Sequence, residues 1–93
     1  MKLIMKKEFE VISKIIQSNK RVLDVGCGDG VLMEYLKNHQ QNDVRGLEPQ
    51  KELVRKSIAK GLSVIEGDAE KELFQFPNKS FDYVVLSQTL QAF

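Results

Sequence analysis

The feature that most constrains the fold of this chain is a group of three glycines between an apolar run and a helical pattern. Residues 21–25 read Arg-Val-Leu-Asp-Val, a short apolar run typical of a buried parallel strand. Gly26, Gly28 and Gly30 then interrupt regular structure, and apolar residues at helical spacing resume at Val31. The sequence therefore predicts a strand, a tight turn and a helix in immediate succession.

Strand-like and helix-like segments alternate along the rest of the chain. Apolar spacing predicts a first helix over about residues 3–18, and a later helix has Pro49 at its first position and Gly61 at its end. Asp29 is expected either to cap the helix that starts at Val31 or to contact a bound ligand. Further strands are expected at residues 43–48, 62–66 and 81–87. Such alternation implies an α/β fold, a Rossmann-like parallel sheet with helices on both faces.

Length and composition limit the remaining choices. With 93 residues the chain is expected to form a single domain spanning 1–93. Strands that stop near Phe93 would leave a sheet edge and apolar surface uncovered, so we expect a truncated unit, the N-terminal half of a larger fold. The net charge of +1 disfavours nucleic acid and anionic membranes as partners, and no stretch approaches the ~20 apolar residues of a membrane span. A single cysteine fits the reducing cytoplasm.

The glycine turn and Glu48 together predict a nucleoside site. Ligands of open parallel sheets bind at the carboxyl ends of the strands, where the first strand-to-helix turn forms the floor. Glu48 ends the second expected strand about 20 residues after that turn, where a carboxylate can accept hydrogen bonds from both ribose hydroxyls. The alternatives are a turn that only needs glycine and a surface carboxylate.

Charge distinguishes between possible nucleoside cofactors. The dinucleotide fingerprint G-x-G-x-x-G is broken here by Val31, and the turn holds no Lys or Arg to neutralise a pyrophosphate. Asp24 and Asp29 flank it instead. A ligand that carries a sulfonium and an ammonium would be attracted by Asp24, Glu48 and Asp68.

These residues also carry a family resemblance. Residues 22–30, Val-Leu-Asp-Val-Gly-Cys-Gly-Asp-Gly, resemble the first motif of class I S-adenosylmethionine-dependent methyltransferases, and Glu48 and Gly67-Asp68 follow the next two strands as they do in that family. Residues 21–30, 64–68 and 76–92 look more narrowly like the MetW methionine-biosynthesis proteins. The Leu-Ser-Gln-Thr-Leu-Gln segment at 86–91 is the most family-specific part.

The resemblance implies residues for the methionine end of the cofactor. Asp24 would hold the turn and reach the ammonium group, and the backbone of Gly26 and Gly28 would lie against the amino-acid portion. Cys27 belongs to the same cofactor-binding turn, and Ser87 would offer its carbonyl at the end of the last strand.

The resemblance also implies residues for the nucleoside end. Glu48 would bind the ribose, Asp68 would accept from the adenine amine, and the Ala69 amide would meet the ring. Leu47 and Pro49 would pack around the nucleoside.

The resemblance implies a methyltransferase-like protein of methionine biosynthesis that transfers a methyl group from S-adenosylmethionine to an unknown acceptor. No catalytic residue can be named from the sequence. One alternative is a non-catalytic partner and regulator of a homoserine O-acyltransferase, with which MetW proteins are associated. The other is an NAD-dependent oxidoreductase, which shares the fold and Glu48 but conflicts with Val31 and the carboxylates.

Several reactive residue types have simpler structural roles. Cys27 lacks an evident partner base, which favours a small packing residue over a nucleophile. His39 lies at the polar end of a helix without a second ligand at zinc-like spacing, so no metal site is expected. Asp82 opens the last strand, away from the expected site. Gln88, Thr89 and Gln91 could orient the methyl acceptor, which is a weaker prediction because the same residues could simply begin a helix.

Overall fold

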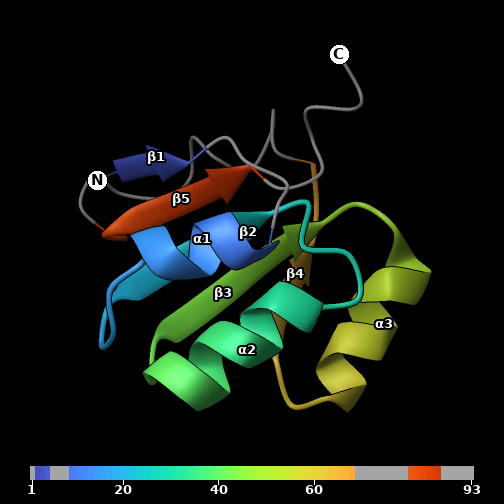
Figure 1. The fold of residues 1–93 in the computed structure, drawn as a ribbon. Helices are drawn as coiled ribbons and strands as arrows, with labels where there is room; N and C mark the ends of the chain where they lie inside the picture. Colours follow the sequence, from blue (N-terminus) through green and yellow to red (C-terminus); the bar gives the residue numbers. More distant parts are fainter. Residues whose placement is uncertain (1, 5–8, 69–79, 87–93) are drawn as a thin grey trace.

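The computed structural model describes residues 2–4, 9–68 and 80–86, and in them the chain forms one parallel sheet (Figure 1). Neighbouring strands in the order β1-β5-β2-β3-β4 are all paired in parallel. The expected α/β, Rossmann-like parallel sheet is confirmed. The strands are β1 (Lys2–Ile4), β2 (Arg21–Val25), β3 (Asp43–Glu48), β4 (Ser63–Glu66) and β5 (Tyr83–Leu86).

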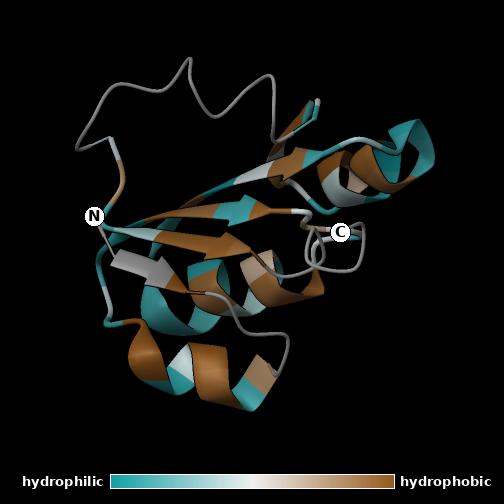
Figure 2. Ribbon diagram, turned by 90° about the horizontal axis from the view of Figure 1, so that it is seen from above, coloured by the Kyte–Doolittle hydropathy of each residue, from teal (hydrophilic) through white to brown (hydrophobic). Residues whose placement is uncertain are grey.

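In the described part of the chain, three helices connect or flank these strands. They are α1 (Phe9–Ile15), α2 (Val31–Gln40) and α3 (Lys51–Ala59). Figures 1 and 2 both place α1 and α2 on the same side of the sheet, and α3 packs along β4 and β3. The sheet order reverses direction at β2, because β3 and β4 follow on one side and β5 lies on the other.

The main core fills the space between the sheet and the helices. Strand residues alternate between faces, so Val22 and Val85 point to the same core as Ile12 of α1 and Met33 and Leu36 of α2. These side chains are almost fully buried, and in the hydropathy colouring of Figure 2 brown segments alternate with teal and white ones along the strands. Burial of this stripe on each helix explains why the amphipathic spacing in the sequence was informative.

A second, smaller cluster lies on the opposite face of the sheet. Leu23 and Val25 of β2 pack there with Val84 of β5 and with Phe81. Every residue of this cluster within the described ranges belongs to a strand or precedes one. Toward β4 the same face is more open, and Ile65 is 53% exposed.

The beginning of the chain differs from the expectation of one helix over residues 3–18. Lys2–Ile4 instead forms β1, which pairs with β5, and the described part of the helix runs only over Phe9–Ile15. Within the described residues the sheet therefore has five strands, where the sequence predicted four for the whole chain. Pairing with β5 outweighs the local helical spacing, because Ile4 becomes buried in the core when it joins the sheet.

Two helix starts also differ from the prediction, while one end is confirmed. The amide of Gly30 donates to the carbonyl of Cys27 at 3.1 Å, and this closed turn makes Gly30 the N-cap of α2 in place of Asp29. Gln50 is the N-cap of α3, so Pro49 lies outside the helix and not at its first position. Gly61 follows α3 with φ +83°, as expected for a glycine that ends a helix.

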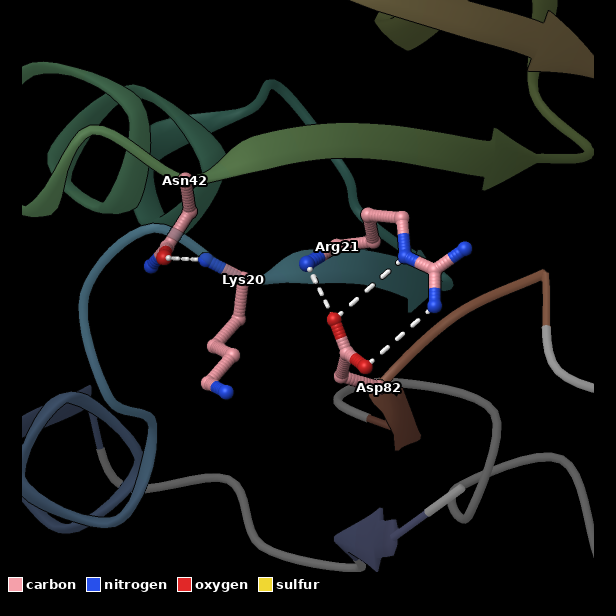
Figure 3. Close-up of polar contacts among 4 residues, drawn as sticks. All are labelled: Lys20, Arg21, Asn42 and Asp82. Atoms are coloured by element: carbon pink, nitrogen blue, oxygen red, sulfur yellow. Dashed lines mark hydrogen bonds and ion pairs between the residues drawn. The ribbon is translucent and has the colours of Figure 1, made fainter.

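At the edge of the sheet where the strands begin, an ion pair joins Arg21 of β2 to Asp82, the residue directly before β5 (Figure 3). The Arg21 amide donates to Oδ2 of Asp82 at 2.9 Å, and its guanidinium nitrogens lie 3.4 Å from the two carboxylate oxygens. The hydrogen bond from the Arg21 amide is the main cause of a lowered pKa of Asp82, and the side-chain hydrogen bonds from Arg21 lower it further. Beside them the Lys20 amide donates to Oδ1 of Asn42 at 2.9 Å. Asp82 therefore lies away from the carboxyl ends, as expected.

None of the helices in the described ranges is both long and apolar enough to cross a membrane.

Candidate cofactor-binding site

The glycine turn (residues 26–30) is joined directly to the end of the neighbouring strand. It begins where β2 ends and leads into α2. The amides of Gly26 and Cys27 both donate to the carbonyl of Leu47 in β3, at 2.7 and 3.3 Å. The turn therefore lies at the carboxyl edge of the sheet, next to the point where strand order reverses, which is where ligands bind in open parallel sheets.

The path of the turn depends on backbone angles that favour glycine. Gly26, Gly28 and Gly30 have φ values of +75°, +62° and +87°. A side chain at such angles is strained. At Gly30 a Cβ would also overlap Cδ1 of Leu62 and lie 3.0 Å from Oγ of Ser57. The glycines are therefore required by the turn itself, whatever the turn binds.

Glu48 is the most constrained charged residue of the site. It is the last residue of β3 and only 2% exposed. Its Oε1 accepts a hydrogen bond from the amide of Gly28 at 2.8 Å, and its Oε2 accepts one from the amide of Gln50 at 2.9 Å. The carboxylate thus connects the glycine turn to the start of α3. Each oxygen keeps a second acceptor position for a hydroxyl donor.

Asp24 supplies a second buried carboxylate one strand away. It lies in β2, is 1% exposed and pairs in register with Gly46 of β3 and Val85 of β5. Asp24 and Glu48 are both close enough to Cys27 for their charges to act on its thiol. Two carboxylates therefore lie around a turn that contains no Lys or Arg.

Cys27 is a packing residue in this arrangement. Its side chain is buried, and burial, followed by the charges of Asp24 and Glu48, raises the pKa of the Cys27 thiol to about 12. Such a thiol stays protonated and unreactive near neutral pH. This supports the sequence-based preference for packing over a nucleophilic role.

The structure brings together only some of the predicted cofactor residues. Asp24, Gly26, Cys27, Gly28 and Glu48 form one continuous group, with Leu47 buried beneath the turn. Pro49 is exposed immediately after Glu48.

The end of β4 lies next to this group. Asp68 is exposed and follows Gly67, whose amide donates to the carbonyl of Glu48 at 3.0 Å. Ala69 and Ser87 lie outside the described residues, as do Gln88, Thr89 and Gln91.

Sequence reasoning missed one polar residue that touches the turn. Ser57 of α3 is completely buried, and its Oγ donates to the carbonyl of Gly28 at 3.0 Å. Its helical spacing from buried Val54 was a usable signal, because residues three apart share a helix face.

His39 has an aromatic neighbour. Its ring stacks on Tyr35, with centroids 4.6 Å apart. Within the described ranges no three side chains of the metal-binding types come together.

The acceptor groups of this site fit a cationic nucleoside better than a dinucleotide. Glu48 can accept hydroxyl hydrogen bonds, and Asp24 adds a buried negative charge on the neighbouring strand. An anionic pyrophosphate at this turn would face both carboxylates without a basic partner. S-adenosylmethionine, with its sulfonium, ammonium and ribose, has the complementary groups.

Comparison with solved structures identifies the class of fold. A methyltransferase of Archaeoglobus fulgidus described as S-adenosylmethionine-dependent superposes with a TM-score of 0.73 at 22% identity, covering 92% of this chain and 41% of that one. A TehB-like methyltransferase of Corynebacterium glutamicum gives 0.70 at 22% identity, over 95% of this chain and 48% of that one. The fold is that of the class I methyltransferases, and the chain spans about half or less of the length of these structures.

Sequence comparison gives the particular family. The chain belongs to the MetW family, described as methionine biosynthesis protein MetW, whose profile matches residues 6–93. A bifunctional methionine biosynthesis protein MetXA/MetW of Rhodopirellula baltica is 33% identical over 91 residues, which cover 89% of this chain and 15% of that protein. The predicted family resemblance is confirmed, and the chain is a methyltransferase-like member of a methionine-biosynthesis family.

Proposed function

We propose that residues 1–93 act as one domain that binds S-adenosylmethionine at the carboxyl edge of the sheet. The single observation that carries the proposal is the pair of buried carboxylates, Asp24 and Glu48, at the ends of adjacent strands around a glycine turn without Lys or Arg. The S-adenosylmethionine dependence stated for two structural neighbours supports it. The reducing cytoplasm is the proposed compartment, because Cys27 is the lone cysteine.

Each residue of the site is proposed to contact a particular chemical group of S-adenosylmethionine. Glu48 would accept from the ribose hydroxyls with the lone pairs that Gly28 and Gln50 leave open, and so would bind without giving up its backbone partners. Asp24 would attract the ammonium group, and the backbone at Gly26 and Gly28 would line the amino-acid portion. Asp68 would accept from the adenine amine.

Two contacts are proposed on family resemblance alone. The amide of Ala69 would meet the adenine ring, and the carbonyl of Ser87 would meet the methionine end. Both residues lie outside the described ranges.

The proposed reaction is methyl transfer to an acceptor whose identity the site leaves open. When bound, S-adenosylmethionine supplies a methyl group activated by its sulfonium. The residues of this chain contribute by binding and orienting the cofactor and by keeping its polar end among buried groups, which is how positioning accelerates an in-line displacement. A general base is needed only where the acceptor has to lose a proton.

Calorimetric titration tests the binding proposal. S-adenosylhomocysteine, the product form of the cofactor, should bind the wild-type chain with one site, and NAD should not bind. Glu48→Ala should weaken binding of S-adenosylhomocysteine, whereas Asp82→Ala, at the opposite edge of the sheet, should leave it unchanged. NAD binding in place of S-adenosylhomocysteine would contradict the proposal and favour an oxidoreductase.

A second candidate function is that of a non-catalytic partner of a homoserine O-acyltransferase. The observation that favours it is the Rhodopirellula relative, which by its description combines MetXA and MetW in one bifunctional protein. Co-expression with a homoserine O-acyltransferase should then give a stable complex that changes acyltransferase turnover without a methylated product. A methylated product formed by the chain without that partner would favour the enzyme instead.

A further inference from the structure

Ser57 is a buried hydroxyl in a place where an apolar side chain would be expected. It lies near the end of α3 with 0% exposure, on the same helix face as buried Val54. A buried hydroxyl without a hydrogen-bond partner is costly, so such groups are nearly always paired. The partner of Ser57 is the carbonyl oxygen of Gly28, 3.0 Å from Oγ and 29 positions earlier in the chain.

This hydrogen bond fixes one of two peptide groups that meet at Gly28. The amide before the Gly28 Cα donates to Glu48 of β3 at 2.8 Å, and the carbonyl after it accepts from Ser57 of α3. Both polar groups of the middle glycine are therefore held by side chains from other elements. The Cys27 thiol adds a weaker hydrogen bond to the same carbonyl, with Sγ 3.8 Å from the oxygen. Since Gly28 has φ +62° and no side chain of its own, the contacts from Glu48 and Ser57 are the main ones that define the direction in which its peptide groups point.

Ser57 also supports the turn by contact. A Cβ on Gly30 would lie 3.0 Å from Oγ and 3.4 Å from Cβ of Ser57. The side chain of Ser57 therefore fills the space directly beside Gly30, together with Leu62. Shortening Ser57 to alanine leaves the buried Gly28 carbonyl with only the weak thiol donor of Cys27, whose Sγ lies 3.8 Å away, and opens a gap below the turn.

We infer that Ser57 is a positioning residue for the cofactor: by holding the Gly28 carbonyl, it keeps the glycine turn in the shape that meets the amino-acid portion of S-adenosylmethionine. The inference rests on the proposed function. Ser57 acts through Gly28 without touching the ligand, and Glu48 acts on the other side of the same residue. A turn held in its binding shape before the ligand arrives loses less freedom on binding, and this preorganisation raises affinity.

The test compares three substitutions in the chain labelled with ¹³C and ¹⁵N. Ser57→Ala removes the hydroxyl donor, Ser57→Thr retains a hydroxyl, and Val54→Ala shortens a buried neighbour on the same helix face that has no hydrogen-bonding group in its side chain. Affinity for S-adenosylhomocysteine is measured by calorimetry, and the free energy of unfolding by urea titration. The carbonyl ¹³C resonance of Gly28 and the amide resonance of Asp29 report on the hydrogen bond itself.

Ser57→Ala should shift the Gly28 carbonyl and Asp29 amide resonances and weaken binding about tenfold, the range expected when a buried acceptor loses its donor. Ser57→Thr should recover most of the affinity. If the added methyl group of Ser57→Thr unfolds the chain, the resonances of Ser57→Ala and the Val54→Ala control still test whether Ser57 positions the Gly28 carbonyl. Val54→Ala should lower stability and leave both the affinity and these resonances unchanged.

Two results would overturn the inference while leaving the proposed function intact. One is wild-type affinity in Ser57→Ala, and the other is an equal loss of affinity in Val54→Ala, which would make the effect one of stability alone. Absence of binding of S-adenosylhomocysteine to the wild-type chain would instead overturn the proposed function, and the inference with it.

Discussion

The carboxyl edge of the sheet, where the strands end, and the amino edge, where they begin, have the same kind of hydrogen bond, from a backbone amide to a carboxylate. The two bonds differ in their exposure to solvent. At the carboxyl edge, Glu48 accepts from the backbone amides of Gly28 and Gln50 and is 2% exposed. At the amino edge, Asp82 accepts from the backbone amide of Arg21, but its side chain is 36% exposed and shares an ion pair with the guanidinium. In both cases a carboxylate joins segments that are far apart in the chain.

Solvent determines what each contact contributes. Water and salt screen the Asp82 pair and can replace it, so an exposed pair of this kind has a small effect on stability. The hydrogen bond from the Gly28 amide to Glu48 is buried, and losing the carboxylate would leave that donor without its partner. Single residues should therefore matter more at the carboxyl edge, which is also the edge where we propose that the ligand binds.

The largest difference between the edges should come from a pair of glycines. Gly30 at the carboxyl edge and Gly61 in the loop before β4 have similar φ values of +87° and +83°. A Cβ at Gly30 meets Leu62 and Ser57, whereas nothing lies within 4 Å of one at Gly61. In urea unfolding, Gly30→Ala should lose about 3 kcal/mol, combining backbone strain with overpacking, and Gly61→Ala about 1 kcal/mol. Equal losses would show that backbone strain alone matters.

Substitution of Glu48 should give the next largest effect. Glu48→Ala removes two acceptors, so affinity for S-adenosylhomocysteine should fall by ~1–3 kcal/mol. The amide of Gly28 should at the same time exchange faster with deuterium. Asp82→Ala is the matched change at the amino edge and should alter neither quantity. Comparable effects from the two substitutions would remove the distinction between the edges.

The reactivity of the Cys27 thiol tests how far solvent is excluded from the carboxyl edge. Its pKa is raised from 9.0 to about 12, so near pH 8 the thiolate fraction should be roughly a thousandfold below that of the unfolded chain. Alkylation by iodoacetamide, followed by mass spectrometry, should be correspondingly slow until urea unfolds the protein. Because the folded-state pKa is the higher one, the stability from the protonated thiol is present below pH 9 and is lost as the pH rises toward 12. Rapid alkylation of the folded chain would contradict the buried placement.

The smallest effect is expected at Asp82. Its pKa is lowered in the folded state, so its contribution to stability is present above the ordinary value of 3.8 and is lost as the pH falls below it. Asp82→Asn should make the unfolding free energy less dependent on pH in that acidic range, and added salt should reduce the difference. A large loss of stability near neutral pH would mean that the amino edge is as constrained as the carboxyl edge.

Local sequence patterns predicted those elements whose conformation depends mainly on residues nearby in the sequence. β2 occupies residues 21–25 as expected, because an apolar run stopped by glycine has few other structures open to it. The end of α3 at Gly61 followed from the same kind of local rule. β1 could not be found this way, since three residues carry little pattern and the strand exists through pairing with β5, about 80 positions away.

The site shows the same limit. The position of Glu48 at the end of β3 was predictable, and so was its place near the glycine turn, because the carboxyl ends of parallel strands meet at one edge. Its backbone partners were not, since they depend on how the turn closes. The spacing of Ser57 from Val54 indicates a shared helix face, but only the approach of α3 to Gly28 makes Ser57 part of the site.

The central claim is that the carboxyl edge binds S-adenosylmethionine, and a proton-nitrogen correlation NMR spectrum of the chain tests it most directly. Titration with S-adenosylhomocysteine should move the amide resonances of residues 26–30, Glu48 and Gln50, leave those of Arg21 and Asp82 in place, and show no matching change with NAD. Resonances that stay fixed with S-adenosylhomocysteine, or that move with NAD instead, would contradict the account.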